Sequence, residues 1–386
     1  MMNLVSCTGK KQQGGADQPA VKPLYLLAGS YASAEEEGIQ LYAFDQEAGE
    51  LTYISGTKGV SNPSYLTLSA SGNYVYAVSE DDEKTSAANV LSLDLRKGTI
   101  ARLGSKLTQG AAPCYIALSP RQDFVVTANY NGGNISIFPL EDGGATLKEP
   151  EVIAFEGHGV DPERQEQPHL HCIGFSPDEQ SLLAVDLGTD CIHILPMAGR
   201  NSGACTLSPD ANDFDTPSFL TGRLSQAIQL PEGCGPRHLC FSSNMKYLYL
   251  ITELSGDVLV MEYKGTDTQI IQTVKADTLG ARGSADIHLT PDGRFLYASN
   301  RLKGDGIAIF KVDRATGRLE KVGYQSTGIH PRNFVISPNG KFLLTACRDT
   351  NEIQIYEIDQ KTGVLNPTGK EIKMSKPTCL KFIFGR

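Results

Sequence analysis

The sequence predicts an all-β protein, a seven-bladed β-propeller of four-stranded antiparallel blades. The first observation is a pattern that recurs six times without a gap, for example as PRHLCFSSNMKYLYLITE at 236–253. The second observation is a partial copy at each end of the chain. A fixed repeat of this kind limits the fold before any single residue is interpreted. The other five copies occupy residues 63–80, 113–130, 170–187, 284–301 and 331–348.

Each copy contains two short runs of apolar, β-branched and aromatic residues joined by a tight turn. The turn reads Pro-Asp-Gly at 291–293 and Pro-Asn-Gly at 338–340. Proline sets φ for a turn and glycine accepts a positive φ, so each pair of runs predicts a β-hairpin.

A third strand follows in most copies, and a fourth is expected in the variable stretch behind it. Third-strand segments occur at 258–263, 306–312 and 352–358, and 270–276 is an example of the fourth. Four strands in a repeat of roughly 45–60 residues is the size of a propeller blade.

The two ends of the chain supply the seventh blade. Residues 376–382 (KPTCLKF) look like the first strand of a further copy, which then stops. Residues 25–30 and 39–45 look like the second and third strands of a copy that lacks its first. Pairing of the N- and C-terminal strands would close the ring and leave no open edge. We therefore expect the propeller to span residues 22–386, because a β-sandwich pair or a β-helix would not require complementary half-copies.

Composition and charge agree with this fold and exclude some partners. The 386 residues exceed what one ordinary core supports, but a propeller adds core between its blades and remains one domain. The chain has no tryptophan, so the Trp-Asp signature of interaction propellers is absent. The net charge of −9 and the lack of a Lys/Arg run argue against nucleic acid or a membrane surface as partner. No transmembrane segment is predicted, and both a monomer and a dimer fit the sequence.

The cysteines and the first residues point to different compartments. The chain has nine cysteines, an odd number at irregular spacings without a C-x-x-C pair, which favours a reducing, cytoplasmic compartment. Residues 1–21 are predicted to be a flexible tail, in which Leu-Val-Ser-Cys at 4–7 resembles the lipid-attachment box of bacterial lipoproteins. The apolar segment that precedes such a box is missing. The alternative, a periplasmic or envelope lipoprotein, requires Cys7 to be lipidated and the start codon to lie upstream.

Two positions of the repeat should surround one mouth of the central channel. In an antiparallel blade, the start of the first strand and the end of the second lie at the same end of the propeller. Their occupants vary between copies and are rich in His, Arg and Glu, as expected for a site built on a repeat scaffold. The second position holds Ser64, Cys114, His171, Arg237, Ala285 and Arg332, and the last position holds Glu80, Tyr130, Leu187, Glu253, Arg301 and Arg348.

Three consecutive copies contribute the predicted catalytic residues: His171, then Arg237 with Glu253, then Arg301. A neutral histidine can take a proton from water or from carbon at pH 7. Arginine binds a carboxylate or phosphate in a fork and can stabilise an oxyanion. Glu253 could hold an arginine in place or orient the base. The set suits hydrolysis or isomerisation of a small acidic lactone, whereas solvated charges and inter-blade ion pairs would explain any one member alone.

Other residues near this mouth are predicted to bind substrate. The polar segment 156–171 is long enough to cover the mouth, which brings Arg164 and Gln165 to it. His238 adjoins Arg237, and Arg332 occupies the second position of the last copy.

His169 is a further candidate, and it raises the alternative of a metal site. It forms an H-x-H pair with His171, and this spacing suits two ligands on one face of a strand. No obvious Asp or Glu ligand set accompanies the pair, so we predict neither a metal nor another cofactor.

At these residues the chain resembles the propeller lactonase family, which includes cycloisomerase-like 6-phosphogluconolactonases and fungal 3-carboxy-cis,cis-muconate lactonizing enzymes. The resemblance implies a seven-bladed propeller with a central-channel site and no required metal. It also implies a catalytic His, Arg, Glu, Arg set. The set maps onto the PHLH histidine (His171, or alternatively His169), Arg237 in GPRH, Glu253 in ITEL and Arg301 in SNR. The matching segments span nearly all of the chain after residue 22 and include DPERQEQPHLHCIGFSPD, GCGPRHLCFS, PDGRFLYASNR and HPRNFVISPNGKFLL.

Three functions follow as hypotheses. The first is hydrolysis of a small anionic sugar lactone, with 6-phosphoglucono-δ-lactone to 6-phosphogluconate as the leading reaction in a pentose phosphate pathway setting. The second is a muconate-type lactonizing cycloisomerisation, in which His171 works on carbon. The third is a non-enzymatic binding or scaffold propeller at the cell envelope, which gains weight if Cys7 is lipidated.

Overall fold

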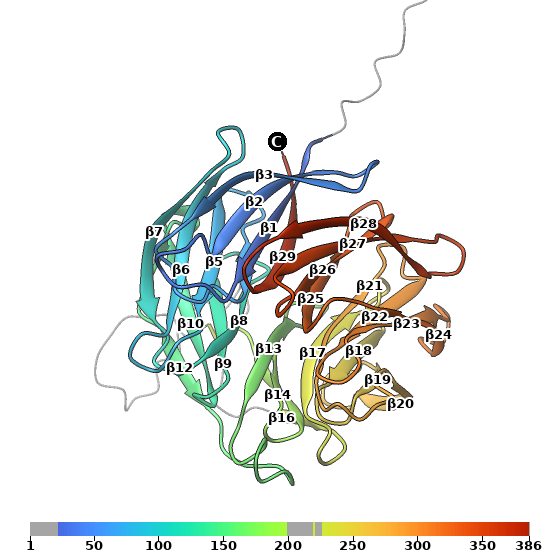
Figure 1. Ribbon diagram of the computed structural model, residues 1–386. Helices are drawn as coiled ribbons and strands as arrows, with labels where there is room; N and C mark the ends of the chain where they lie inside the picture. Colours follow the sequence, from blue (N-terminus) through green and yellow to red (C-terminus); the bar gives the residue numbers. More distant parts are fainter. Residues whose placement is uncertain (1–21, 199–218, 221–225, 386) are drawn as a thin grey trace, which may run out of the picture.

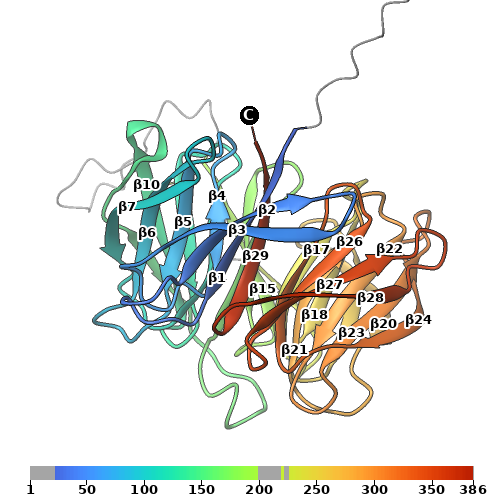
Figure 2. The same cartoon turned by 45° about the horizontal axis from the view of Figure 1, so that its top comes forward.

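The computed structural model describes residues 22–198, 219–220 and 226–385. Seven antiparallel sheets stand around one axis, as the two views in Figures 1 and 2 show, and this confirms the predicted seven-bladed propeller. Within the described ranges, no helix is long and apolar enough to cross a membrane. The predicted tail, residues 1–21, lies outside them together with Cys7.

In each blade the strand order from the channel outward follows the aligned repeat. Blade 1 contains β29 (Pro377–Phe384), β1 (Leu24–Ser30), β2 (Ile39–Asp45) and β3 (Glu50–Thr57). Blade 2 contains β4 (Leu66–Leu68), β5 (Tyr74–Ser79), β6 (Ala87–Asp94) and β7 (Thr99–Leu107). Blade 3 contains β8 (Pro113–Leu118), β9 (Phe124–Asn129), β10 (Asn134–Glu141) and β12 (Glu151–Ala154), with the 3-10 turn Asp142–Gly144 and the short β11 (Thr146–Leu147) at the end of β10.

The remaining four blades repeat this order. Blade 4 contains β13 (Leu170–Phe175), β14 (Ser181–Asp186), β15 (Cys191–Pro196) and β16 (Gln226–Gln229). Blade 5 contains β17 (Pro236–Phe241), β18 (Tyr247–Thr252), β19 (Asp257–Glu262) and β20 (Gln269–Lys275). Blade 6 contains β21 (Ser284–Leu289), β22 (Phe295–Asn300), β23 (Gly306–Val312) and β24 (Leu319–Ser326), and blade 7 contains β25 (Pro331–Ile336), β26 (Phe342–Cys347), β27 (Glu352–Ile358) and β28 (Leu365–Lys373).

Pairing of the two chain ends closes the ring, as the half-copies predicted. Strand β29, red in Figure 1, runs antiparallel to the blue β1, with Leu24 opposite Phe384 and Ala28 opposite Leu380. The innermost strands touch one another in ring order, from β29 to β4, β8, β13, β17, β21 and β25 and back to β29. The pairing of β29 with β1 therefore completes blade 1, and the ring of inner strands closes around the channel.

The hydrophobic core lies between neighbouring blades. One cluster joins Tyr249 and Val260 of blade 5 to Leu296 and Phe310 of blade 6, all fully buried. A tyrosine of the second strand also reaches the next blade, because Tyr249 donates a hydrogen bond of 3.0 Å to the carbonyl oxygen of Gly317. Tyr76 and Tyr297 bind Gly144 and Gly363 in the same way. Each blade is thus held by its neighbour, so the inner strands keep fixed positions around the channel.

A β-bulge at the second repeat position decides which side chains face the channel. In β17, Pro236 pairs with Thr252 and His238 pairs with Ile251, so Arg237 has no partner of its own. The same shift occurs at the second position of five further inner strands, β8, β13, β21, β25 and β29. An extra residue bends the strand and re-aims its side chain, which lets two consecutive residues line one cavity.

Candidate active site

Three of the four predicted catalytic residues form one buried ionic cluster. The Oε2 atom of Glu253, directly after β18, lies 2.7 Å from Nε of Arg237 and 3.2 Å from a terminal nitrogen of Arg301. Arg301 follows β22 and also donates to the carbonyl oxygen of Gly283 at 2.7 Å. Arg237 is 1 % exposed and Glu253 is 7 % exposed, so these charges have little water around them. Strong pairing is therefore required to keep them ionised.

A third arginine reaches the same carboxylate from the segment between blades 3 and 4. Arg164 places a terminal nitrogen 2.7 Å from Oε1 of Glu253. The segment is tied down by an ion pair between Asp161 and Arg282 of the loop that precedes blade 6. Burial alone would raise the pKa of Glu253, but the charges of Arg301, Arg237 and Arg164 outweigh it and hold this pKa well below its ordinary value. Glu253 is thus a permanent anion that gathers three cations.

His171, the fourth predicted residue, borders a small cavity together with Arg237. The cavity offers about 10 Å³ to the centre of a water-sized sphere, which is room for about one water molecule. Burial and the charge of Arg237 keep the pKa of His171 well below its ordinary value, so the imidazole is neutral at pH 7. The lining residues are Tyr65, Cys114, His171, Arg237, His238, Arg332, Asn333 and Thr378.

Arg332 completes the cluster from blade 7. Its guanidinium lies over the ring of Tyr31 at 5.4 Å and within 3.8 Å of Oε1 of Glu80. Tyr31 donates a hydrogen bond of 2.7 Å to the same oxygen, and Ser64 donates to the other oxygen of Glu80. Burial acts against the charge of Arg332, but Tyr31 and Glu80 raise its pKa overall. Four guanidinium groups therefore surround the carboxylates of Glu253 and Glu80. With the anionic Asp286, which contacts His238 beside the cavity, the cluster keeps an excess of one positive charge.

The other predicted substrate-binding residues have more varied positions. His238 lines the cavity next to Arg237. The side chain of Gln165 is fully buried; its amide donates to the carbonyl oxygen of Leu187 at 2.8 Å and accepts from the backbone of Asp161 at 3.2 Å. Gln165 thus holds its own loop in place.

His169 lies outside the lining of the cavity. Its Nδ1 is 2.9 Å from the carbonyl oxygen of Tyr130, its Nε2 is 3.3 Å from Glu166, and its ring stacks on Tyr130. Both ring nitrogens of His169 are therefore engaged away from His171.

Among the described residues, the one His/Cys/Asp/Glu group close enough to hold a metal lies elsewhere. It consists of Asp186, Cys191 and His193 in blade 4. Thr189 donates to Asp186 at 2.6 Å and touches the thiol of Cys191 at 3.1 Å, and His193 lies 3.3 Å from both of the other members. These contacts link β14 to β15 as ordinary hydrogen bonds and brace the blade.

Five residues of the candidate site were not identified from the sequence, although the repeat contains the signal for them. Tyr31 and Thr378 occupy the last and second positions of the two half-copies, as alignment of YLLAGSY with YVYAVSE and of PTCLKF with PRHLCF shows. Asp286, Tyr65 and Asn333 occupy the third position of their copies. The carboxylate of Asp286 accepts a hydrogen bond of 2.8 Å from Nδ1 of His238. In the bulged strands, side chains at the third position turn toward the site because of the β-bulge, so strand alternation alone does not mark them as site residues.

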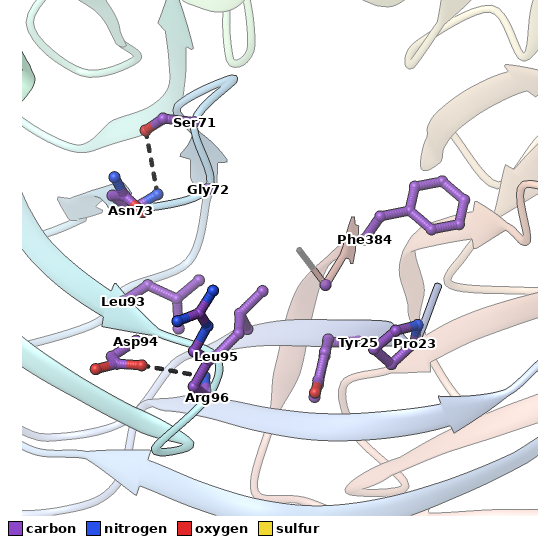
Figure 3. Close-up of a pocket in the computed structure, with 11 residues that line it drawn as sticks. Pro23, Tyr25, Ser71, Gly72, Asn73, Leu93, Asp94, Leu95, Arg96 and Phe384 are labelled. Carbon is purple, nitrogen blue, oxygen red and sulfur yellow. Dashed lines mark hydrogen bonds between the residues drawn. The ribbon is translucent and has the colours of Figure 1, made fainter. Parts of the chain in front are cut away.

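A larger cavity of about 410 Å³ lies apart from this cluster, near the chain ends (Figure 3). It is bordered by Pro23, Tyr25 and Phe384 on one side. On the other side lie the turn that precedes β5 and the turn that joins β6 to β7. Its carboxylate, Asp94, accepts hydrogen bonds from the backbone of its own turn, at 3.0 Å from the nitrogen of Arg96. No histidine or cysteine is among the described residues that border this cavity.

Comparison with known proteins gives one consistent result. A family of seven-bladed β-propeller lactonases matches residues 25–382. The 6-phosphogluconolactonase of Bacillus subtilis is 31 % identical over 365 residues, which cover 92 % of this chain and 97 % of that protein. A crystal structure of a putative 6-phosphogluconolactonase from Bacteroides fragilis is 47 % identical, with a TM-score of 0.86 over 95 % of this chain and all of the other. The periplasmic gluconolactonase of Pseudomonas aeruginosa is 29 % identical, with a TM-score of 0.83 over 93 % of this chain and 99 % of the other.

Proposed function

Since the chain belongs to the seven-bladed β-propeller lactonase family, we propose that it hydrolyses a small anionic lactone, with 6-phosphoglucono-δ-lactone as the first candidate. The observation that carries the proposal is the charge of the site. Four arginines outnumber the three carboxylates Glu253, Glu80 and Asp286, and this positive excess favours an anionic ligand such as a phosphate monoester, which carries about −1.5 to −2 at pH 7.

The cluster contains groups for each step of a lactone hydrolysis. The cavity between His171 and His238 has room for one water, which must lose a proton as it attacks the acyl carbon. Arg237 borders the same cavity and can stabilise the oxyanion that forms on the carbonyl oxygen. Arg301 and Arg332, on either side, are the proposed phosphate ligands, because arginine binds phosphate in a bidentate fork.

Substrate binding requires the cluster to open. A cavity of about 10 Å³ holds a water molecule and excludes a sugar lactone. The most exposed arm of the cluster is Arg164, whose side chain is 35 % exposed and sits on a loop. We infer that the side chain of Arg164 breaks its ion pair with Glu253 to admit the substrate. It then pairs with an anionic group of the bound ligand instead.

The scaffold alternative receives less support from the geometry. The scaffold alternative does not require these residues to converge, whereas Arg237, Glu253 and Arg301 lie together beside the cavity that His171 borders. The muconate alternative keeps the same site and differs only in the reaction, so it is separated by the choice of substrate.

The test is hydrolysis of freshly generated 6-phosphoglucono-δ-lactone, corrected for spontaneous ring opening. Wild type and Arg301→Ala are compared, with glucono-δ-lactone, a cis,cis-muconate and an EDTA-treated sample in parallel. Rapid turnover by the wild type and its loss in the variant are expected. Turnover of the muconate alone would replace hydrolysis by cycloisomerisation, and no turnover of any compound would overturn the enzyme proposal.

A further inference from the structure

His238 is held in one orientation and one tautomer by a carboxylate behind it. Its Nδ1 lies 2.8 Å from Oδ1 of Asp286, which is 1 % exposed. A carboxylate accepts hydrogen bonds, so Nδ1 carries the proton and Nε2 carries the lone pair. A terminal nitrogen of Arg237, which can only donate, lies 3.4 Å from this Nε2 and requires the same tautomer.

Asp286 is itself fixed from every side, which makes it a rigid anchor. Its Oδ1 also accepts from the backbone of Ile287 at 3.0 Å. Its Oδ2 accepts from Nε2 of His288 at 2.9 Å, from the amide of Asn333 at 2.5 Å and from the backbone of Phe334 at 3.2 Å. Burial would raise the pKa of Asp286, but His288 and His238 hold it well below its ordinary value. The carboxylate is therefore a buried anion that can stabilise a positive charge on His238.

His238 and His171 border the same water-sized cavity but differ in what lies behind them. Their rings are 5.3 Å apart and meet edge to face. Nδ1 of His171 is 3.6 Å from the thiol of Cys114, and burial raises the pKa of this thiol, so it stays protonated and uncharged. Among the contacts of the described residues, none joins His171 to a carboxylate. An imidazolium formed at His171 would thus be a buried cation without a counter-ion.

We propose that His238, oriented by Asp286, is the general base of this site. The inference rests on the proposed hydrolysis of a lactone. Nε2 of His238 takes one proton from the cavity water as the water oxygen bonds to the acyl carbon. The ring C–O bond then breaks, and the imidazolium returns the proton to the departing ring oxygen, which becomes a hydroxyl group. The products are the hydroxy acid and unchanged His238, and His171 shapes the cavity as a neutral neighbour.

The charge of Arg237 makes this base sensitive to bound substrate. In the free protein, burial and Arg237 lower the pKa of His238 to about 4, with Asp286 opposing them. When an anionic substrate pairs with Arg237, the repulsion of an imidazolium by the guanidinium weakens. The proton affinity of His238 then rises in the complex with substrate, in which His238 is proposed to take the proton from water.

The test compares His238→Asn with His171→Asn. The amide nitrogen of asparagine can replace Nδ1, so His238→Asn keeps a donor toward Asp286 and removes only Nε2. We expect kcat on 6-phosphoglucono-δ-lactone to fall by about 10²–10⁴-fold in His238→Asn with little change in KM. His171→Asn should fall by less than about tenfold. Full activity in His238→Asn together with loss in His171→Asn would overturn the proposal, whereas an inactive wild type would overturn the proposed function itself.

Asp286 is a positioning residue, and its test is a pH profile. Asp286→Asn should lower kcat and move its acidic limb to lower pH, because the imidazolium loses its anion; a purely structural loss would leave the limb in place. The groups that face His238 are Arg237, His171, Asp286, Tyr65 and Tyr115. If the variants do not fold, ¹⁵N spectra of the wild-type histidines decide: a proton on Nε2 of His238 at neutral pH would exclude it as the base.

Discussion

The carboxylate of Glu253 accepts a 2.7 Å hydrogen bond from Nε of Arg237, and both side chains are almost fully buried. Two buried charges in contact cost free energy to desolvate, and neither tolerates loss of the other. The pair joins the end of β18 to the bulge of β17, so it fixes the geometry of one blade where the chemistry is proposed to occur.

Glu253→Gln is therefore expected to lower both stability and activity. The free energy of unfolding should fall by about 3 kcal/mol or more, because three arginines lose their counter-ion. Urea unfolding followed by circular dichroism measures the change. The exposed Glu232→Gln is the control and should stay within about 0.5 kcal/mol of the wild type. An unchanged midpoint in Glu253→Gln would show that the arginines have other partners in solution.

Stability should fall as the pH drops below about 6.5, the ordinary pKa of histidine. The folded-state pKa of His238 is lowered to about 4, so between these pH values the unfolded chain binds a proton that the folded chain does not. The lowered pKa of His171 changes the stability in the same direction. Each contributes a loss of about 1.4 kcal/mol per pH unit. The lowered pKa values of Glu253 and Asp286 add a further loss below about pH 4, where unfolded carboxylates become protonated.

Unfolding free energies at pH 7.5, 6 and 5 test this dependence. His238→Asn should give a shallower slope than the wild type between pH 6.5 and 4. Parallel slopes for the two proteins would mean that His238 is accessible to protons in the folded state.

The ring and the convergence of Arg237, Glu253 and Arg301 were predictable because repetition makes the pattern visible. Six complete copies fix two hairpin strands in six blades, and the complementary half-copies fix the seventh blade, which β29 and β1 close. The second and last positions of the repeat vary between copies, and they predicted that Arg237, Glu253 and Arg301 lie together. Repeat position alone sufficed here, because equivalent residues of a symmetric ring must converge on its axis.

The full set of residues at the site was not predictable, because it depends on a local break in the alternation of side chains along the inner strand. Regular alternation would turn Arg237 and His238 to opposite faces of β17. The bulge brings both to one cavity and so admits Asp286 into the site. The sequence predicted that segment 156–171 brings Arg164 to the mouth, but it did not predict the ion pair of Arg164 with Glu253. A loop without regular structure carries no periodic signal that fixes which side chains meet.

Arg164→Ala should raise KM more than it lowers kcat. Its guanidinium is the outermost of the four and is proposed to bind substrate rather than the reacting atoms. An increase of about tenfold in KM, with kcat within about threefold of the wild type, is expected from loss of one charge-assisted contact of about 1.5 kcal/mol. Steady-state kinetics measures it, and the exposed Arg318→Ala is the matched control. A drop in kcat alone would instead assign Arg164 to the chemical step.

Leu380→Ala tests the closure of the ring. Leu380 of β29 is 1 % exposed and packs with residues of β1 and of blade 7, so its truncation should cost about 2–5 kcal/mol. Phe384→Ala, four residues further along the same strand and 46 % exposed, is the control and should cost little. If both substitutions were neutral in thermal unfolding, the C-terminal strand would not be part of the folded ring in solution.

Binding of the reaction product isolates phosphate recognition from turnover. A ligand that binds only the folded protein stabilises it by about 2.7 kcal/mol at 100 times its Kd, so 6-phosphogluconate should raise Tm. Gluconate lacks the dianionic group that Arg301 and Arg332 are proposed to bind, and should raise Tm much less at the same concentration. Arg332→Gln should reduce the shift given by 6-phosphogluconate and leave that of gluconate nearly unchanged, whereas Arg318→Gln should alter neither. Equal shifts from both ligands in the wild type would mean that the phosphate is not bound, and would make an unphosphorylated sugar lactone the better candidate substrate.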